Sequence, residues 1–133
     1  MTGAKLAIVF DDEGGEEPRY EPGSALSGRA VFTPKAETTV NGVSLSVRWK
    51  TRGKGDDSSG EIWSKTEEIP EGSRVVEAGR TVSWPFRCQL PESPWSYTGK
   101  VFSIVWEVGV RLDVSWAVDP HAVREFTLHP PPF

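Results

Sequence analysis

The stretch Ser83–Trp116, SWPFRCQLPESPWSYTGKVFSIVWEVGVRLDVSW, contains two alternating apolar segments separated by prolines. In its second half every other residue from Phe102 to Trp116 is apolar, and most residues between them are polar or charged. A period of two is typical of a β-strand with one buried face. The segment before it alternates in the same way and ends at Pro91, because proline has no N–H for a strand ladder. Two long strands, each with one buried face, need a covering layer, so the stretch predicts a β-sandwich.

The remaining sequence fits one all-β domain spanning residues 1–133. Turn-forming residues punctuate it, as in the glycine-rich and aspartate-rich segment Arg52–Gly60, which predicts a hairpin loop. We expect no helix and about seven strands: Lys5–Phe10, Gly28–Thr33, Thr39–Thr51, Glu61–Ile69, Thr81–Leu90, Val101–Trp116 and Val123–Leu128.

Two upstream segments occur in a fixed order with the opening stretch. They are YEPGSALSGRAVFTP at Tyr20–Pro34 and VNGVSLSVRW at Val40–Trp49. Together with the Pro-Phe, Gln-Leu-Pro, Ser-Tyr-Thr-Gly-Lys and Trp-Glu-Val elements of the opening stretch, they resemble the N-terminal domain of arrestins, including bacterial sporulation-control relatives. The likeness covers about Tyr20 to His129. It implies an immunoglobulin-like β-sandwich of the arrestin N-domain type, and a non-catalytic adaptor or scaffold function.

Charge and composition exclude several classes of function. The formal net charge is −4, which argues against nucleic acid as a partner because phosphate binding needs a basic surface. No apolar run reaches the 18 residues of a transmembrane helix. The N-terminus does not resemble a secretory signal, and one cysteine forms no internal disulfide. We therefore expect a cytoplasmic protein.

The sequence offers no catalytic, cofactor-binding or metal-binding set, so we expect no enzyme and no cofactor. Cys88 alternates in phase with core residues, where a thiol is inert. His121 and His129 lack partners at metal-ligand spacing. The acidic segment Asp11–Glu17 holds five carboxylates, which could chelate calcium, but its irregular spacing favours a solvated loop.

A row of basic residues is the main candidate binding site. Arg48, Lys50, Arg52 and Lys54 recur with period two on the predicted solvent face of one strand. Such a row could hold an acidic peptide or a phosphate. The alternative is cross-strand pairing with Glu61 and its neighbours across the hairpin.

The arrestin resemblance implies one further binding residue, Arg124. Counted back from the proline that ends the last strand, it matches the arginine that acts as a phosphate-sensitive trigger in visual-type arrestins. The family's partner acids are not matched in this chain, apart from a loose match at Asp11 or Asp12. A buried charge without partners is costly, so we expect Arg124 to face solvent or to pair with a local carboxylate.

Two readings of function follow. The first is a protein-binding or scaffold module whose partner the sequence does not identify, and which forms a homodimer through the apolar edge strand Lys5–Phe10 or a face left open. The alternative is a carbohydrate-type ligand-binding sandwich, in which exposed rings of Trp63, Trp95 and Trp116 would stack on sugars.

Overall fold

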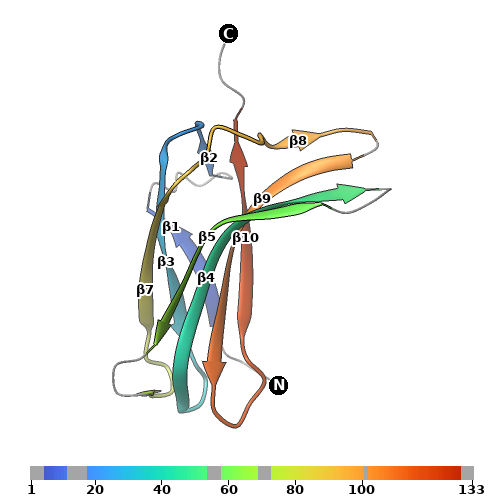
Figure 1. The fold of residues 1–133 in the computed structure, drawn as a ribbon. Coiled ribbons are helices and arrows are strands. Elements are labelled where there is room, and N and C mark those ends of the chain that lie inside the picture. Colours follow the sequence, from blue (N-terminus) through green and yellow to red (C-terminus); the bar gives the residue numbers. More distant parts are fainter. Residues whose placement is uncertain (1–4, 12–17, 54–57, 69–72, 101, 130–133) are drawn as a thin grey trace.

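The fold is an all-β sandwich of two unequal sheets, as the sequence predicts (Figure 1). The computed structural model describes residues 5–11, 18–53, 58–68, 73–100 and 102–129. The small sheet has the order β1-β3-β7, and the large sheet has the order β2-β10-β9-β4-β5, with β6 paired to β4 and β8 paired to β9. The strands are β1 Lys5–Phe10, β2 Arg19–Tyr20, β3 Ala25–Thr33, β4 Thr38–Gly53, β5 Ser59–Glu68, β6 Arg74–Val76, β7 Val82–Gln89, β8 Tyr97–Thr98, β9 Phe102–Val114 and β10 His121–Leu128.

The seven strands expected from the alternating pattern are all present, with ends that differ by at most three residues. The expected total was too low, because the described residues also contain β2, β6 and β8, which are two or three residues long. Segments this short hold a single period of alternation, and one period without repetition is too little for the sequence pattern to detect.

The core lies between the inner faces of the two sheets and is centred on Trp106 of β9. Its side chain is fully buried, its indole nitrogen donates to the carbonyl of Pro94 at 2.7 Å, and its ring lies 5.8 Å from that of Phe126. A buried indole N–H needs such an acceptor. The proline corner between β7 and β8 therefore both ends a strand and completes the polar contact of the central ring.

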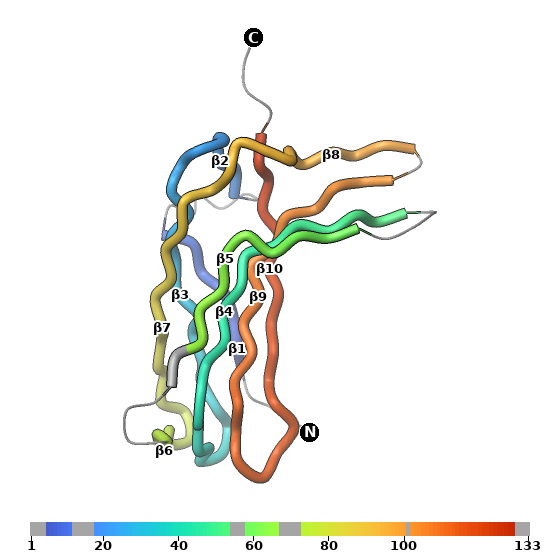
Figure 2. The backbone as a smooth tube through the Cα atoms, viewed as in Figure 1, coloured from blue at the N-terminus to red at the C-terminus, as the bar shows by residue number. Residues whose placement is uncertain are grey.

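The large sheet is longer than the small one, and its excess length forms a projecting arm. The arm consists of residues 50–53 of β4, 59–60 of β5, β8 and 102–105 of β9. Figure 1 and Figure 2 show these segments leaving the sandwich together, away from β1, β3 and β7. The arm follows from length, because β4 has 16 residues and β9 has 13, whereas β3 has 9 and β7 has 8.

Candidate functional site

The outer face of the large sheet carries a row of small polar side chains. Ser44 of β4 lies opposite Thr66 of β5 and Arg111 of β9, and the next outward residue, Ser46, lies opposite Ser64 and Gly109. These residues alternate with the core residues of β4, so they point away from the small sheet. The hydroxyl groups of Ser44, Ser46, Ser64 and Thr66 lie beside Gly109, which has no side chain. Together these residues form a shallow surface that we call the polar floor.

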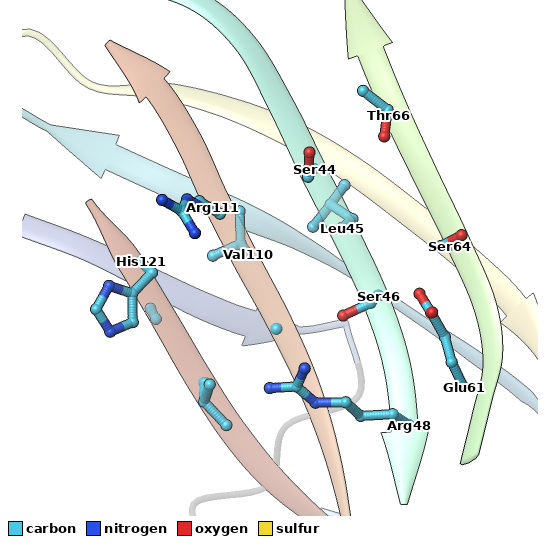
Figure 3. Close-up of a pocket in the computed structure, with 13 residues that line it drawn as sticks. Ser44, Leu45, Ser46, Arg48, Glu61, Ser64, Thr66, Val110, Arg111 and His121 are labelled. Atoms are coloured by element: carbon cyan, nitrogen blue, oxygen red, sulfur yellow. The ribbon is translucent and has the colours of Figure 1, made fainter. Parts of the chain in front are cut away.

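This floor lies in an open groove with a volume of about 450 Å³ (Figure 3). Arg111 and His121 lie toward one end of the groove, and Arg48 lies toward the other. Its lining residues are Ser44, Leu45, Ser46, Arg48, Glu61, Ser64, Thr66, Gly109, Val110, Arg111, His121, Ala122 and Val123. The groove therefore has a mixed polar and apolar lining, with a guanidinium group toward each end.

Gly109 keeps the centre of the groove open. A Cβ built on Gly109 would lie 3.3 Å from Oγ of Ser46 and 3.9 Å from Nη2 of Arg48. The Arg48 side chain thus lies across β9 at the glycine, with Nη2 close above the floor. A larger residue at position 109 would fill the space beside this guanidinium group.

A buried carboxylate holds Arg48 in this position. Glu107 of β9 is 1% exposed, and its Oε1 accepts a hydrogen bond of 2.7 Å from Nε of Arg48. Its Oε2 has no hydrogen bond within the described residues but lies 3.3 Å from Nζ of Lys50. Two cations therefore balance one buried anion. Because the bond uses Nε, the two terminal nitrogens of Arg48 remain on the groove side.

At the other end of the groove, Arg111 is much less constrained. Its side chain is 69% exposed, and Nη2 lies 3.5 Å from Oδ2 of Asp119. The other oxygen of Asp119 accepts from the backbone N–H of Val114 at 3.1 Å. A pair this exposed and this long is weak, so the Arg111 guanidinium can turn toward a bound anion at little cost.

The described residues of the expected basic row are divided between two acidic partners, Glu107 and Glu125. Cross-strand pairing occurs, but Arg48 and Lys50 pair with Glu107 on β9 rather than with Glu61 across the hairpin. Arg52 pairs with Glu125 of β10 at 2.9 Å. Lys54 lies outside the described residues. Of Arg48, Lys50 and Arg52, the residues of the row that the structure describes, only Arg48 lines the groove.

Arg124 does not lie in the groove. It falls in the inward phase of β10 and is only partly exposed, so the expectation that it faces solvent is wrong. Its Nη1 donates to the carbonyl of Ile8 at 2.9 Å, and its guanidinium carbon lies 5.0 Å from the ring centroid of Phe10. Arg124 therefore ties the edge strand β1 to β10, and it blocks one acceptor of the edge that was expected to pair with a second chain.

Arg111 and Glu107 are two charged residues on this face that the sequence analysis did not select as part of a site. Both fall in the polar phase of β9, which places them on the outer face. The alternation cannot say which residues of β4 lie beside them, because that depends on the register between strands distant in the sequence. The register puts Arg48 opposite Glu107 and Ser44 opposite Arg111.

The described residues contain no group of three or more histidine, cysteine or acidic side chains placed to hold a metal ion. Burial raises the pKa of the Cys88 thiol to about 11, so it is protonated and unreactive at neutral pH. Of the acidic segment, Asp12 to Glu17 lie outside the described residues. Within the part of the chain that is described, no helix has the length and hydropathy to cross a membrane.

The exposed tryptophans do not form a shared stacking surface. Trp116 is 102% exposed and lies in the turn between β9 and β10. Trp95 is 38% exposed and precedes Ser96, whose N–H donates to the carbonyl of Leu128 at the far end of β10. Trp63 is partly buried against the core. Because Trp95 and Trp116 lie at opposite ends of β10, the geometry gives the carbohydrate-binding alternative no support.

Comparison with known proteins identifies the fold. No protein-family model and no curated protein matches the chain. Among solved structures, the chain is similar to Spo0M, a sporulation control protein from Bacillus subtilis, with a TM-score of 0.74 and 18% sequence identity. The match covers 98% of this chain and 51% of that chain, so the chain spans about half the length of the structure it matches. The arrestin-like sandwich expected from the sequence is confirmed.

Proposed function

We propose that the protein is a non-catalytic binding module that holds an extended, acidic segment of a partner protein in the groove on the outer face of the large sheet. The observation that supports this most is the pair of arginines, Arg48 and Arg111, at the ends of a polar floor. Guanidinium groups bind carboxylates through paired hydrogen bonds. The buried, protonated Cys88 adds no nucleophile to the groove.

The spacing of the two arginines defines the ligand further. Arg111 lies opposite Ser44, and Ser44 and Arg48 are four residues apart on β4, which corresponds to about 13 Å of strand at about 3.3 Å per residue. In an extended peptide, side chains four residues apart also point to the same side at that distance. A segment running along β4 with acidic residues at positions i and i+4 would therefore reach both guanidinium groups.

A peptide array tests this function. Nine-residue peptides of glycine and serine carry two glutamates that are four or three residues apart, or two lysines that are four apart. We expect the native protein to retain the i, i+4 glutamate peptides best, because only those place both carboxylates on one side. Retention should fall at least several-fold for Arg111→Gln, whose exposed side chain is dispensable for folding.

The matched control is Arg87→Gln, which removes the same charge from an exposed position on β7 of the other sheet. It should leave retention unchanged. Equal retention by Arg111→Gln and the native protein would place binding elsewhere, and no retention of any acidic peptide would contradict the proposed ligand class.

A further inference from the structure

The inner face of the projecting arm carries a patch of exposed aromatic and aliphatic side chains. We call Trp49, Tyr97, Phe102 and Ile104 the arm patch. Tyr97 is 51% exposed and Phe102 is 42% exposed, and their rings lie 5.5 Å apart. Trp49 and Ile104 are partly exposed. Solvent-exposed apolar side chains that gather in one place mark interaction surfaces more often than scattered ones do.

Strand register shows that the arm patch continues the face that covers the core. Trp49 lies opposite the fully buried Trp106, Tyr97 lies opposite Ile104, and Phe102 is two residues further along β9 in the same phase. The side-chain exposure along β9 rises from Trp106 through Ile104 to Phe102. The arm extends past the small sheet (Figure 1). Elsewhere the inner face of the large sheet lies against the core. In the arm, no second layer formed by the described residues covers that face.

The charge distribution on the arm indicates which kind of partner would cover the arm patch. The arm patch carries no charged side chain, whereas the opposite face of the arm carries Lys50 and Arg52. In a two-fold interface the same patch of both copies is in contact, so an uncharged face suits self-association and a cationic face opposes it. The fold also occurs in a chain about twice as long, since this chain matches 51% of the Spo0M chain. We propose that the arm patch docks against the arm patch of a second copy of this chain.

The other surface expected to self-associate is less suitable. The edge strand β1 has its Ile8 carbonyl occupied by Arg124, and its Ile8 and Phe10 side chains are buried in the core. A further strand added at that edge would have to displace Arg124. The arm patch needs no such rearrangement.

The exposed area of the arm patch sets the expected strength of the dimer contact. Tyr97 and Phe102, each about half exposed, would together bury roughly 200 Å² per copy if covered, given 150 to 250 Å² for a whole aromatic side chain. Stable interfaces bury about 800 Å² per partner. The contact therefore predicts a weak, concentration-dependent dimer rather than a permanent one.

Sedimentation equilibrium of the whole chain between about 5 and 500 μM tests this proposal. We expect the native protein to shift from monomer to dimer over that range. Phe102→Lys and Phe102→Glu should each be monomeric, because the two-fold axis brings like charges together, and an equimolar mixture of the two should associate again. Circular dichroism and thermal melting verify that both variants are folded.

The control is Val118→Ser, which removes a side chain that is 91% exposed in the turn between β9 and β10. It should dimerise like the native protein. A native protein that is monomeric at every concentration would overturn the proposal. So would unchanged dimerisation of the folded Phe102 variants, or a mixture of them that associates no better than either alone. Because no peptide is involved, these results are independent of the groove.

Discussion

Glu107 illustrates what alternation can and cannot predict for a single residue. Its place between apolar residues of β9 puts it on the outer face, and it lies there. The pattern also implies an exposed side chain, yet Glu107 is 1% exposed because Arg48 and Lys50 cover it. Long basic side chains can bury a neighbour with their apolar stems. Whether they do so depends on the register between β4 and β9, which the local sequence does not encode.

The first prediction compares two arginines of the basic row. Arg48→Ala leaves the buried Glu107 without its hydrogen-bond donor, and we expect a loss of about 1 to 3 kcal/mol in the free energy of unfolding. Arg52→Ala removes a pair whose side chains are 57% and 43% exposed, which should cost about 0.2 to 1 kcal/mol. Urea unfolding of both variants measures the difference. Equal losses would mean that Glu107 is adequately solvated without Arg48.

The second prediction concerns Cys88, whose side chain lies in the core beside Phe86 and Leu90 in the same phase. Burial raises the pKa of its thiol to about 11. A thiol reagent should therefore react slowly with the native protein at pH 8 and rapidly after denaturation. Rapid labelling of the native protein would place the thiol at the surface.

The same pKa shift has a consequence for stability. The folded state favours the protonated thiol, so this contribution is fully present below the ordinary thiol pKa of 9.0 and is lost as the pH rises toward about 11. We expect Cys88→Ala to reduce the loss of stability over that interval. A melting temperature that falls equally in both proteins between pH 9 and 11 would contradict this assignment.

At the scale of the element, long strands are predictable and short ones are not. The eight-residue β7 and the 13-residue β9 repeat their alternation several times, which fixes both the strand and its buried side. β2 and β8 have two residues each and exist only because longer strands lie beside them. The alternating pattern does not predict the arm either. Phe102 and Trp106 have the same phase, but only Trp106 has a second layer opposite it.

The third prediction uses this difference within one strand. Trp106→Ala removes a fully buried ring and should cost about 3 to 5 kcal/mol. Phe102→Ala, in the same phase but 42% exposed, should cost about 0.5 kcal/mol, as is usual for a surface site. Thermal or urea unfolding measures both values. A cost below about 1 kcal/mol for Trp106→Ala would show that the ring contributes little to the core.

At the scale of the whole molecule, an ordered set of segments predicts the fold better than it predicts the site. The segments from Tyr20 to Trp116 resemble an arrestin N-terminal domain, and the similarity to Spo0M confirms that architecture. The groove instead combines β4, β5, β9 and β10, whose side chains meet only through the order of strands in the sheet. The sequence predicts Arg48 as a binding residue. It does not single out Arg111 at the other end of the groove, because β9 is recognised by its alternating apolar residues.

An NMR titration with an i, i+4 diglutamate peptide tests directly whether the groove on the outer face of the large sheet is the binding site. We expect backbone amide shifts to change in saturable fashion at Ser44, Ser46, Gly109 and Arg111, with little change along β3 and β7. Raising the salt concentration should weaken the response, because the contacts are charged and exposed. Shift changes confined to the small sheet or to the arm patch, or none at millimolar peptide, would contradict it.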